Sequence, residues 1–167
     1  GGTLNKPYVV KSVVDLETGK KQHFTGQKIK RVLTESQART MRLMLTDVTS
    51  EKGTGFNARI YGFPVAGKTG TAQKVDFKNG GYLAKSYISS FAGFVPANDP
   101  KFVIYISVDN PRLKFYGSTV VAPIFSKVAS YAVLKAGLPP VLLNQNNIIE
   151  EDRLEVTPLK GVQARAL

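Results

Sequence analysis

One short segment, residues 62–72 (GFPVAGKTGTA), concentrates the groups of this chain that could do chemistry. It fits G-x-x-x-x-G-K-[ST], the pattern with which a loop and the helix after it bind phosphate groups. It also contains Lys68, Thr69 and Gly70 in succession, a K-T-G sequence that in certain serine enzymes lies on an extended strand of the active site. The elements around the segment decide between these two chemistries.

The phosphate-binding interpretation requires a buried strand before the loop and a helix that begins near the lysine. Residues 58–61 (ARIY) are too few and too polar for a central strand, and Pro64 removes a backbone donor from the loop. After Thr69, the β-branched Thr71 and Val75 favour a strand over a helix. The surroundings therefore argue against a nucleotide site and favour the lysine strand.

The residues downstream predict an antiparallel meander of three strands. The first spans residues 65–75, and a turn at residues 78–81 (KNGG) connects it to the second, residues 87–95, because Asn-Gly and Gly-Gly tolerate positive φ. The third, residues 102–108 (FVIYISV), is apolar on both faces, so we expect it to be a central strand.

Two helices are expected to pack against this sheet. A capping box at residues 34–37 (TESQ) predicts the start of the first, and a glycine at position 137 predicts the end of the second, which begins near residue 120. The expected buried stripes are Ala38, Met41, Leu45 and Val48 on the first helix, and Ile124, Val128, Tyr131 and Leu134 on the second.

The remaining segments complete an α+β fold. A turn at residues 17–20 (ETGK) predicts a small hairpin that ends near Phe24. We expect residues 1–139 to form part of one domain and residues 140–167 to form a polar tail or linker. The last part of this tail weakly resembles the opening of a PASTA repeat.

The composition limits the possible partners and cofactors. A formal net charge of +11 favours anionic partners, but the basic residues are dispersed and no RNA-binding motif is present, so we expect no nucleic-acid partner. The chain has no cysteine and a single histidine, His23, which we expect on the surface, and it therefore predicts no metal site and no cofactor.

Several blocks of sequence in a fixed order resemble one family. They are VTSEKGTG at 48–55, VAGKTGTAQK at 65–74, YISSFAGFVP at 87–96, and YG at 116–117 followed by APIF at 122–125. Together they resemble the C-terminal part of the transpeptidase domain of a class B penicillin-binding protein, over roughly residues 1–139. The chain is most similar to the septal, cell-division type.

The resemblance implies a five-stranded antiparallel sheet between helices and a D,D-transpeptidase that cross-links peptidoglycan stem peptides ending in D-Ala-D-Ala and is acylated by β-lactams. It places the parent protein in the bacterial cytoplasmic membrane, in a cell-division complex, with this part outside the cytoplasm. By resemblance, the hydroxyls of Thr69 and Thr71 bind the terminal carboxylate, and Lys68 supplies positive potential and joins the proton relay. The N–H of Thr71 would be an oxyanion-hole donor. Gly70 would leave room for the nucleophile.

Two further segments have a possible place in this site. Tyr116 and Gly117 either line its mouth, as the resemblance implies, or pack as an ordinary loop. The segment Gly53-Thr54-Gly55 either shapes its rim or only ends the first helix.

The family's other motifs are not found in these 167 residues. No serine is followed by lysine three positions later, and none by asparagine two positions later. We therefore expect this chain to carry one wall of the site, to be inactive alone, and to self-associate through an apolar strand edge at residues 102–108. The alternative is a non-catalytic module that binds peptide along the same edge strand.

Overall fold

The computed structural model describes residues 1–141, and the chain divides into two compact units, Gly1–Met44 and Leu45–Leu167. Residues 142–167 lie outside the described part, and with them most of the expected polar tail and its resemblance to a PASTA repeat.

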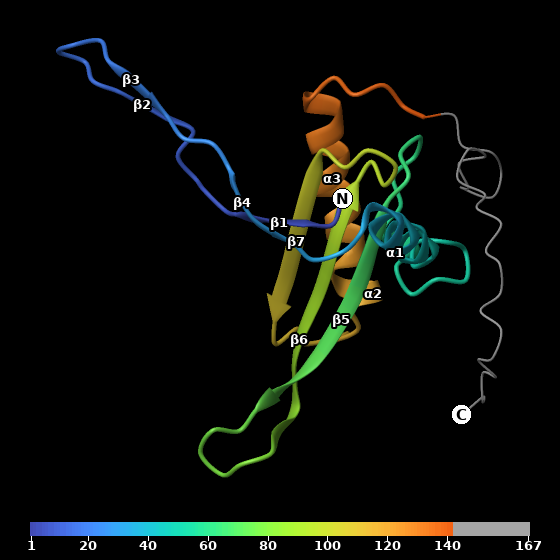
Figure 1. Ribbon diagram of the computed structural model, residues 1–167. Helices are drawn as coiled ribbons and strands as arrows, with labels where there is room; N and C mark the ends of the chain where they lie inside the picture. Colours follow the sequence, from blue (N-terminus) through green and yellow to red (C-terminus); the bar gives the residue numbers. More distant parts are fainter. Residues whose placement is uncertain (142–167) are drawn as a thin grey trace. The chain divides into compact units, whose positions relative to one another are not determined.

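The first unit contains two antiparallel β-ribbons. Strand β1 (Thr3–Lys6) pairs with β4 (Gln27–Arg31), and β2 (Ser12–Val14) pairs with β3 (Lys21–His23) (Figure 1). The β2–β3 hairpin is the one that the sequence predicts, whereas the β1–β4 pairing joins segments more than twenty residues apart and has no local signal.

The β2–β3 turn shows why this short hairpin forms. The Asp15 carboxylate accepts hydrogen bonds from the N–H groups of Glu17 and Thr18, both at 2.9 Å. Gly19 adopts a φ of +69°, which a residue without a Cβ reaches without strain. His23 is exposed on β3, as expected.

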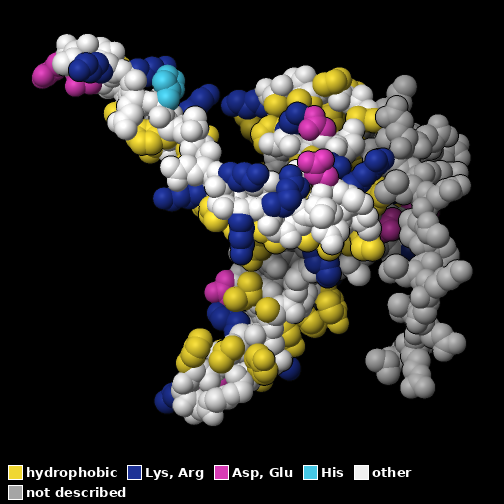
Figure 2. All heavy atoms as spheres, viewed as in Figure 1, with side chains coloured by type: hydrophobic (Ala, Val, Ile, Leu, Met, Phe, Trp, Pro, Cys, Tyr) yellow, Lys and Arg dark blue, Asp and Glu magenta, His cyan; other side chains and the backbone are white. Residues whose placement is uncertain are grey.

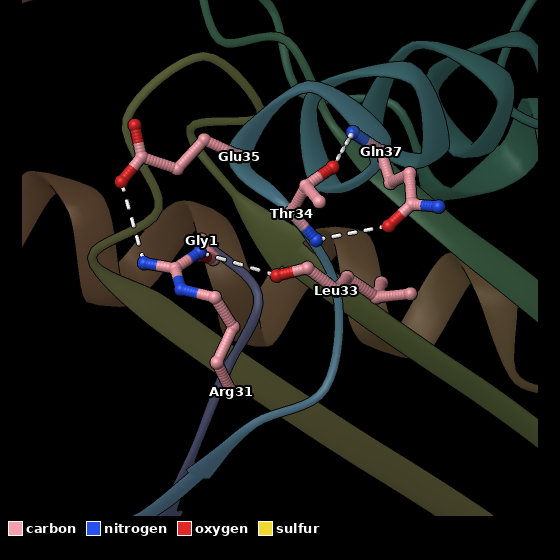
Figure 3. A network of polar contacts seen from close by, with 6 residues as sticks. All are labelled: Gly1, Arg31, Leu33, Thr34, Glu35 and Gln37. Atoms are coloured by element: carbon pink, nitrogen blue, oxygen red, sulfur yellow. Dashed lines mark hydrogen bonds and ion pairs between the residues drawn. The ribbon is translucent and has the colours of Figure 1, made fainter.

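Helix α1 (Glu35–Asp47) begins with the predicted capping box. The Thr34 N–H donates to Gln37 Oε1 at 2.9 Å, and the Gln37 N–H donates to Thr34 Oγ1 at 3.2 Å (Figure 3). The Arg31 guanidinium lies beside this turn and bonds to the Leu33 carbonyl and to the Glu35 carboxylate. The capping box thus provides hydrogen-bond acceptors for two backbone N–H groups at the start of the helix, those of Thr34 and Gln37.

The expected burial of the α1 stripe is wrong for the described residues. No residue of α1 is buried, and Met41 is 47% exposed. The spacing of apolar residues, three and four positions apart, correctly predicts a helix. It does not reveal whether another element covers the apolar face of that helix.

The second unit contains the predicted meander. Strands β5 (Ala66–Val75), β6 (Tyr82–Val95) and β7 (Phe102–Asp109) form one antiparallel sheet in the order β5-β6-β7 (Figure 1). Strand β6 begins five residues earlier than predicted, because the ladder continues past a bulge and pairs Val75 with Tyr82.

The prediction that the third strand is central is wrong within the described sheet. Strand β7 pairs only with β6, and its side chains alternate between partly buried and exposed, with Val103 82% and Tyr105 65% exposed. Apolar residues on both faces indicated coverage on both sides. In residues 1–141, only the face that carries Phe102 and Ile104 packs against the core.

Helix α3 (Ala122–Lys135) follows the short α2 (Gly117–Val120) and covers this face of the sheet. Its end is as predicted: Gly137 adopts a φ of +64° and its N–H donates to the Leu134 carbonyl at 3.0 Å. The Phe125 ring lies 4.6 Å from the Phe91 ring of β6, measured between centroids. These two rings form the centre of the core.

The stripe predicted to be buried on this helix faces the wrong way. The buried residues are Ala122, Phe125, Ala129 and Val133, whereas the predicted Ile124, Val128, Tyr131 and Leu134 are 41%, 44%, 64% and 71% exposed. The helix has two apolar stripes, and the one that faces the sheet combines Phe125 and Val133 with two alanines, which permit a close approach.

Candidate functional site

Strand β5 carries the predicted site residues at the edge of the sheet. Lys68 pairs with Ala92, Thr69 with the buried Phe91, and Thr71 with the buried Ser89. Directly paired residues share a face, so both threonines lie on the face that packs toward the core and Lys68 lies on the other. Because β5 pairs only with β6 among the described strands, the backbone groups on its outer side have no strand partner.

Each of the two threonine hydroxyls is positioned by a neighbouring loop. Thr69 Oγ1 and Thr54 Oγ1 share a hydrogen bond at 3.2 Å, and Thr71 Oγ1 accepts a hydrogen bond from the Gly117 N–H at 3.1 Å. Thr54 and Gly117 therefore contact the predicted site residues directly. For both of them the sequence left two possibilities, a place in the site or an ordinary loop role. Fifteen and 46 positions separate the partners, so no local pattern could have paired them.

Two glycines allow the close approach of these segments. A Cβ on Gly117 would lie 2.6 Å from the Gly70 carbonyl oxygen and would clash with the Ser90 carbonyl oxygen. A Cβ on Gly70 would clash with Ser90 Oγ. Ser90 Oγ ends a side chain that can rotate away, so the packing requires glycine at position 117, where the contacts are backbone atoms, more strictly than at position 70. The room for a nucleophile at Gly70 stays a prediction from the resemblance.

The ammonium of Lys68 is exposed and donates to the Thr69 carbonyl at 2.9 Å. It forms no ion pair within residues 1–141, so its charge is not neutralised by a carboxylate of this part of the chain. An anionic ligand could reach it from the solvent, which fits the predicted role of Lys68.

An aromatic stack holds the loop before α2 against the sheet. The rings of Tyr87 and Phe115 stack at 4.3 Å, and Tyr116 lies next to Phe115 at 4.5 Å, measured between centroids. The buried Ser89 hydroxyl donates to the Phe115 carbonyl. This packing fixes the loop and so the Gly117 N–H that bonds to Thr71.

The predicted site residues lie on a single strand of the described part of the chain. The four predicted site residues, Lys68 to Thr71, follow one another on β5, with the two hydroxyls on one face and the exposed ammonium, which donates to the Thr69 carbonyl, on the other. Residues 1–141 contain no group of three or more His, Cys, Asp or Glu that could hold a metal ion. In the same range, no helix is long and apolar enough to span a bilayer.

Comparisons with known proteins show the family of this chain. Residues 1–130 match the family described as the penicillin binding protein transpeptidase domain. Stage V sporulation protein D of Bacillus subtilis is 43% identical over 144 residues, which cover 84% of this chain and 22% of that protein. The probable peptidoglycan D,D-transpeptidase PenA of Neisseria meningitidis is 38% identical over 112 residues, which cover 66% of this chain and 19% of that protein.

Solved structures give the same result. Penicillin binding protein 3 of Mycobacterium tuberculosis in complex with ampicillin superposes with a TM-score of 0.78 at 29% identity, over 89% of this chain and 34% of that one. The transpeptidase domain of penicillin-binding protein 3 from Burkholderia pseudomallei superposes with a TM-score of 0.62 at 36% identity, over 69% of this chain and 34% of that one. The chain thus spans about a fifth of the curated relatives and a third of the solved ones, and it belongs to the penicillin-binding protein transpeptidase family, with the class B resemblance that its motifs indicated.

Proposed function

We propose that this chain supplies the substrate-binding wall of a serine-type peptidoglycan D,D-transpeptidase. The observation that carries the proposal is the position of Lys68, Thr69 and Thr71 on an edge strand whose outer side has no strand partner. A peptide that ends in D-Ala-D-Ala adds to this edge as a further strand. Its terminal carboxylate then accepts hydrogen bonds from the two threonine hydroxyls, and the exposed Lys68 ammonium adds positive potential.

The hydrogen bonds already made support these roles. Thr71 Oγ1 accepts from the Gly117 N–H, so the hydrogen of its own hydroxyl is left to donate to a carboxylate. The hydroxyl pair of Thr54 and Thr69 can run in either direction, and when Thr54 donates, Thr69 is free to donate outward. The Thr71 N–H donates to the oxyanion that forms at the scissile carbonyl.

The nucleophile belongs to a segment outside these 167 residues. The family's Ser-x-x-Lys and Ser-x-Asn motifs are not found in this sequence. A serine attacks the carbonyl between the two D-alanines, D-alanine leaves, and the amine of a second peptide resolves the acyl-enzyme. Gly70 keeps the strand clear for that attack. This chain alone is therefore inactive, and β-lactams acylate only the protein that also contains the serine.

The parent protein acts in cell-wall synthesis on the outer side of the bacterial cytoplasmic membrane. We infer a membrane anchor and a septal, cell-division complex from the motif resemblance. The relative with 43% identity is named as a sporulation protein, which makes cross-linking of wall material during sporulation the second candidate for the biological process. A non-catalytic peptide-binding module is the alternative for the chain itself.

A chimera tests the proposal. Residues 1–141 replace the matching segment of the Bacillus subtilis sporulation protein, and the folded chimera is incubated with a fluorescent penicillin. We expect a covalent label that survives denaturation, and a labelling rate about a hundredfold lower in the Lys68→Ala variant. The matched control is Lys127→Gln, an exposed lysine of α3, which should label normally.

Two results would contradict the proposal. A folded chimera that is not labelled would favour the non-catalytic module. A covalent label on the unmodified 167-residue chain would show that a nucleophile lies within it.

A further inference from the structure

A short segment next to the site, residues 54–57 (TGFN), contacts both elements that carry or hold the two threonine hydroxyls. It is called the bridging segment here. Thr54 Oγ1 shares a hydrogen bond with Thr69 Oγ1 of β5 at 3.2 Å. Three positions later in the sequence, Asn57 Nδ2 donates to the Ser118 carbonyl of α2 at 3.0 Å. One segment therefore bonds to the site strand at one end and to α2 at the other.

The bond to α2 reaches the second hydroxyl of the site. The Gly117 N–H opens α2 and donates to Thr71 Oγ1, and the Ser118 carbonyl belongs to the same turn. With four residues, α2 is about one turn long, and so short a helix is not stable without contacts from outside. The direction of the Gly117 N–H thus depends on the contacts that hold this turn, and the Asn57 amide supplies one of them.

The bridging segment is itself anchored in the core. It overlaps the 3₁₀ turn η1 (Phe56–Ala58), which ends in the buried Ala58, and Gly55 before this turn is buried too. A Cβ on Gly55 would lie 3.0 Å from the Phe91 ring, so the backbone of the segment approaches this ring closely. Phe91 is the β6 residue that pairs with Thr69. The two polar side chains of the segment therefore project from a turn whose position is fixed against the sheet.

The Ser118 carbonyl decides which end of the Asn57 amide faces α2. A carbonyl oxygen can only accept a hydrogen bond, so the NH₂ group of the amide must lie toward it. An aspartate in this place would have nearly the same shape but no donor. The contact therefore depends on the amide hydrogen, and a substitution can remove that hydrogen without changing the size of the side chain.

We propose that the bridging segment positions both threonine hydroxyls of the site, with Asn57 acting through α2 on Thr71 and Thr54 acting directly on Thr69. Because both side chains come from one anchored turn, the segment keeps the two hydroxyls oriented toward the same carboxylate before it binds. Groups that are held in place beforehand lose less freedom on binding, which raises the rate of the step that follows. This inference rests on the proposed function and deepens it, since it assigns Asn57 as a positioning residue of the same site.

Amide hydrogen exchange of the 167-residue chain, followed by NMR, tests the connection through α2 without any ligand. In Asn57→Ala and in Asn57→Asp, the Gly117 amide should exchange about two- to tenfold faster, the range that one hydrogen bond contributes. The Phe91 amide in the core should keep its rate, because only the local turn loses a contact. A purely structural role of Asn57 would change both exchange rates together.

The two variants separate the lost donor from an added charge. Figure 2 shows Lys and Arg side chains spread over the face in view, so the new carboxylate of Asn57→Asp can pair with a cation, which Asn57→Ala excludes. Faster exchange in both variants assigns the effect to the donor. The matched control is Asn5→Asp, the same change at an exposed position of β1, which should leave the Gly117 amide unchanged.

The chimera with the Bacillus subtilis sporulation protein tests the consequence for the site. Asn57→Ala should lower its rate of labelling by fluorescent penicillin about two- to tenfold. In a Thr71→Val background, Asn57→Ala should lower the rate no further, because the hydroxyl through which it acts is gone. Thr54→Val should also slow the labelling, and Thr54→Ser, which retains the hydroxyl, should recover most of that loss.

The outcomes separate the two proposals. Unchanged Gly117 exchange in both Asn57 variants would overturn the positioning role and leave the proposed function intact. An Asn57→Ala effect on labelling that is equally large with and without the Thr71 hydroxyl would do the same, because Asn57 would then add only general stability. An unmodified chimera that is folded but not labelled would overturn the proposed function, and the positioning role with it.

Discussion

At the scale of single residues, the bond between Thr71 and Gly117 connects binding to stability. The Gly117 N–H is in a buried residue and has Thr71 Oγ1 as its acceptor. Thr71→Val removes this acceptor while keeping the shape of the side chain. We expect it to lower the free energy of unfolding by about 1–3 kcal/mol, the usual cost of a buried donor without a partner.

Urea unfolding of the 167-residue chain measures this cost. The matched control is Thr71→Ser, which retains the hydroxyl and should unfold near the midpoint of the unmodified chain. Equal stability of the valine and serine variants would mean that the Gly117 N–H finds another acceptor, and the loop would then not depend on Thr71.

The same residues show what the sequence could predict. Lys68 to Thr71 were identified as a strand from their neighbours, since β-branched residues and an Asn-Gly turn are local signals. The partners Thr54 and Gly117 have no such local signal, and the sequence leaves each of them either a place in the site or an ordinary loop role. Their bonds depend on how distant loops fold over the sheet, which the local sequence does not encode.

At the scale of elements, α3 illustrates a limit of periodicity. Both of its stripes satisfy the three-and-four spacing, and the spacing alone predicts burial of Ile124, Val128, Tyr131 and Leu134 as readily as burial of the other stripe. The structure buries Phe125 and exposes Leu134. Periodicity gives the helix and its approximate ends, but which stripe faces inward depends on the shape of the sheet surface.

A pair of alanine substitutions tests this assignment. Phe125→Ala should destabilise the second unit by about 3–5 kcal/mol because it leaves a cavity against Phe91. Leu134→Ala, at a position that is 71% exposed, should change stability by about 0.5 kcal/mol or less. The difference in urea midpoints decides, and a larger loss for Leu134→Ala would restore the original prediction.

The turn between β5 and β6 should respond to acid. Hydrogen bonds from the side chain of Asn79 and from the N–H groups of Asn79 and Lys78 hold the pKa of Asp76 below its usual value. A carboxyl with a lowered pKa in the folded state stabilises the turn above its unfolded pKa of about 3.9, and this stability is lost as the pH falls through the folded pKa. We therefore expect an intact turn at pH 5 and a loosened one once the pH falls below the lowered pKa of Asp76.

Amide NMR over this range reports the transition. The amides of Lys78 and Asn79 should shift together as Asp76 gains its proton. In the Asp76→Ala variant, the transition should disappear and the amides should already have shifted at pH 5. Persistence of the acid transition in this variant would assign it to another group.

At the scale of the whole molecule, the chain presents part of a larger sheet. The family resemblance implied five strands, and the described part of the second unit contains three of them, with β7 paired on one side only. The superposition on solved transpeptidases covers most of this chain but only about a third of theirs. The open side of β7 and the outer stripe of α3 are therefore apolar surfaces without a partner in residues 1–141.

These surfaces should make the 167-residue chain self-associate. An exposed apolar edge strand pairs readily with a second copy, and Val103 is 82% exposed beside the free edge of β7. Sedimentation velocity at rising protein concentration should show dimers or larger species, and Val103→Lys should shift the population toward monomer. Ser107→Lys adds the same charge to the same exposed side of β7 without removing an apolar side chain, so it should have a smaller effect. If both lysine variants dissociate the chain equally, net charge and not the apolar surface controls association. An unmodified chain that stays monomeric at high concentration would show that the free edge of β7 is already protected.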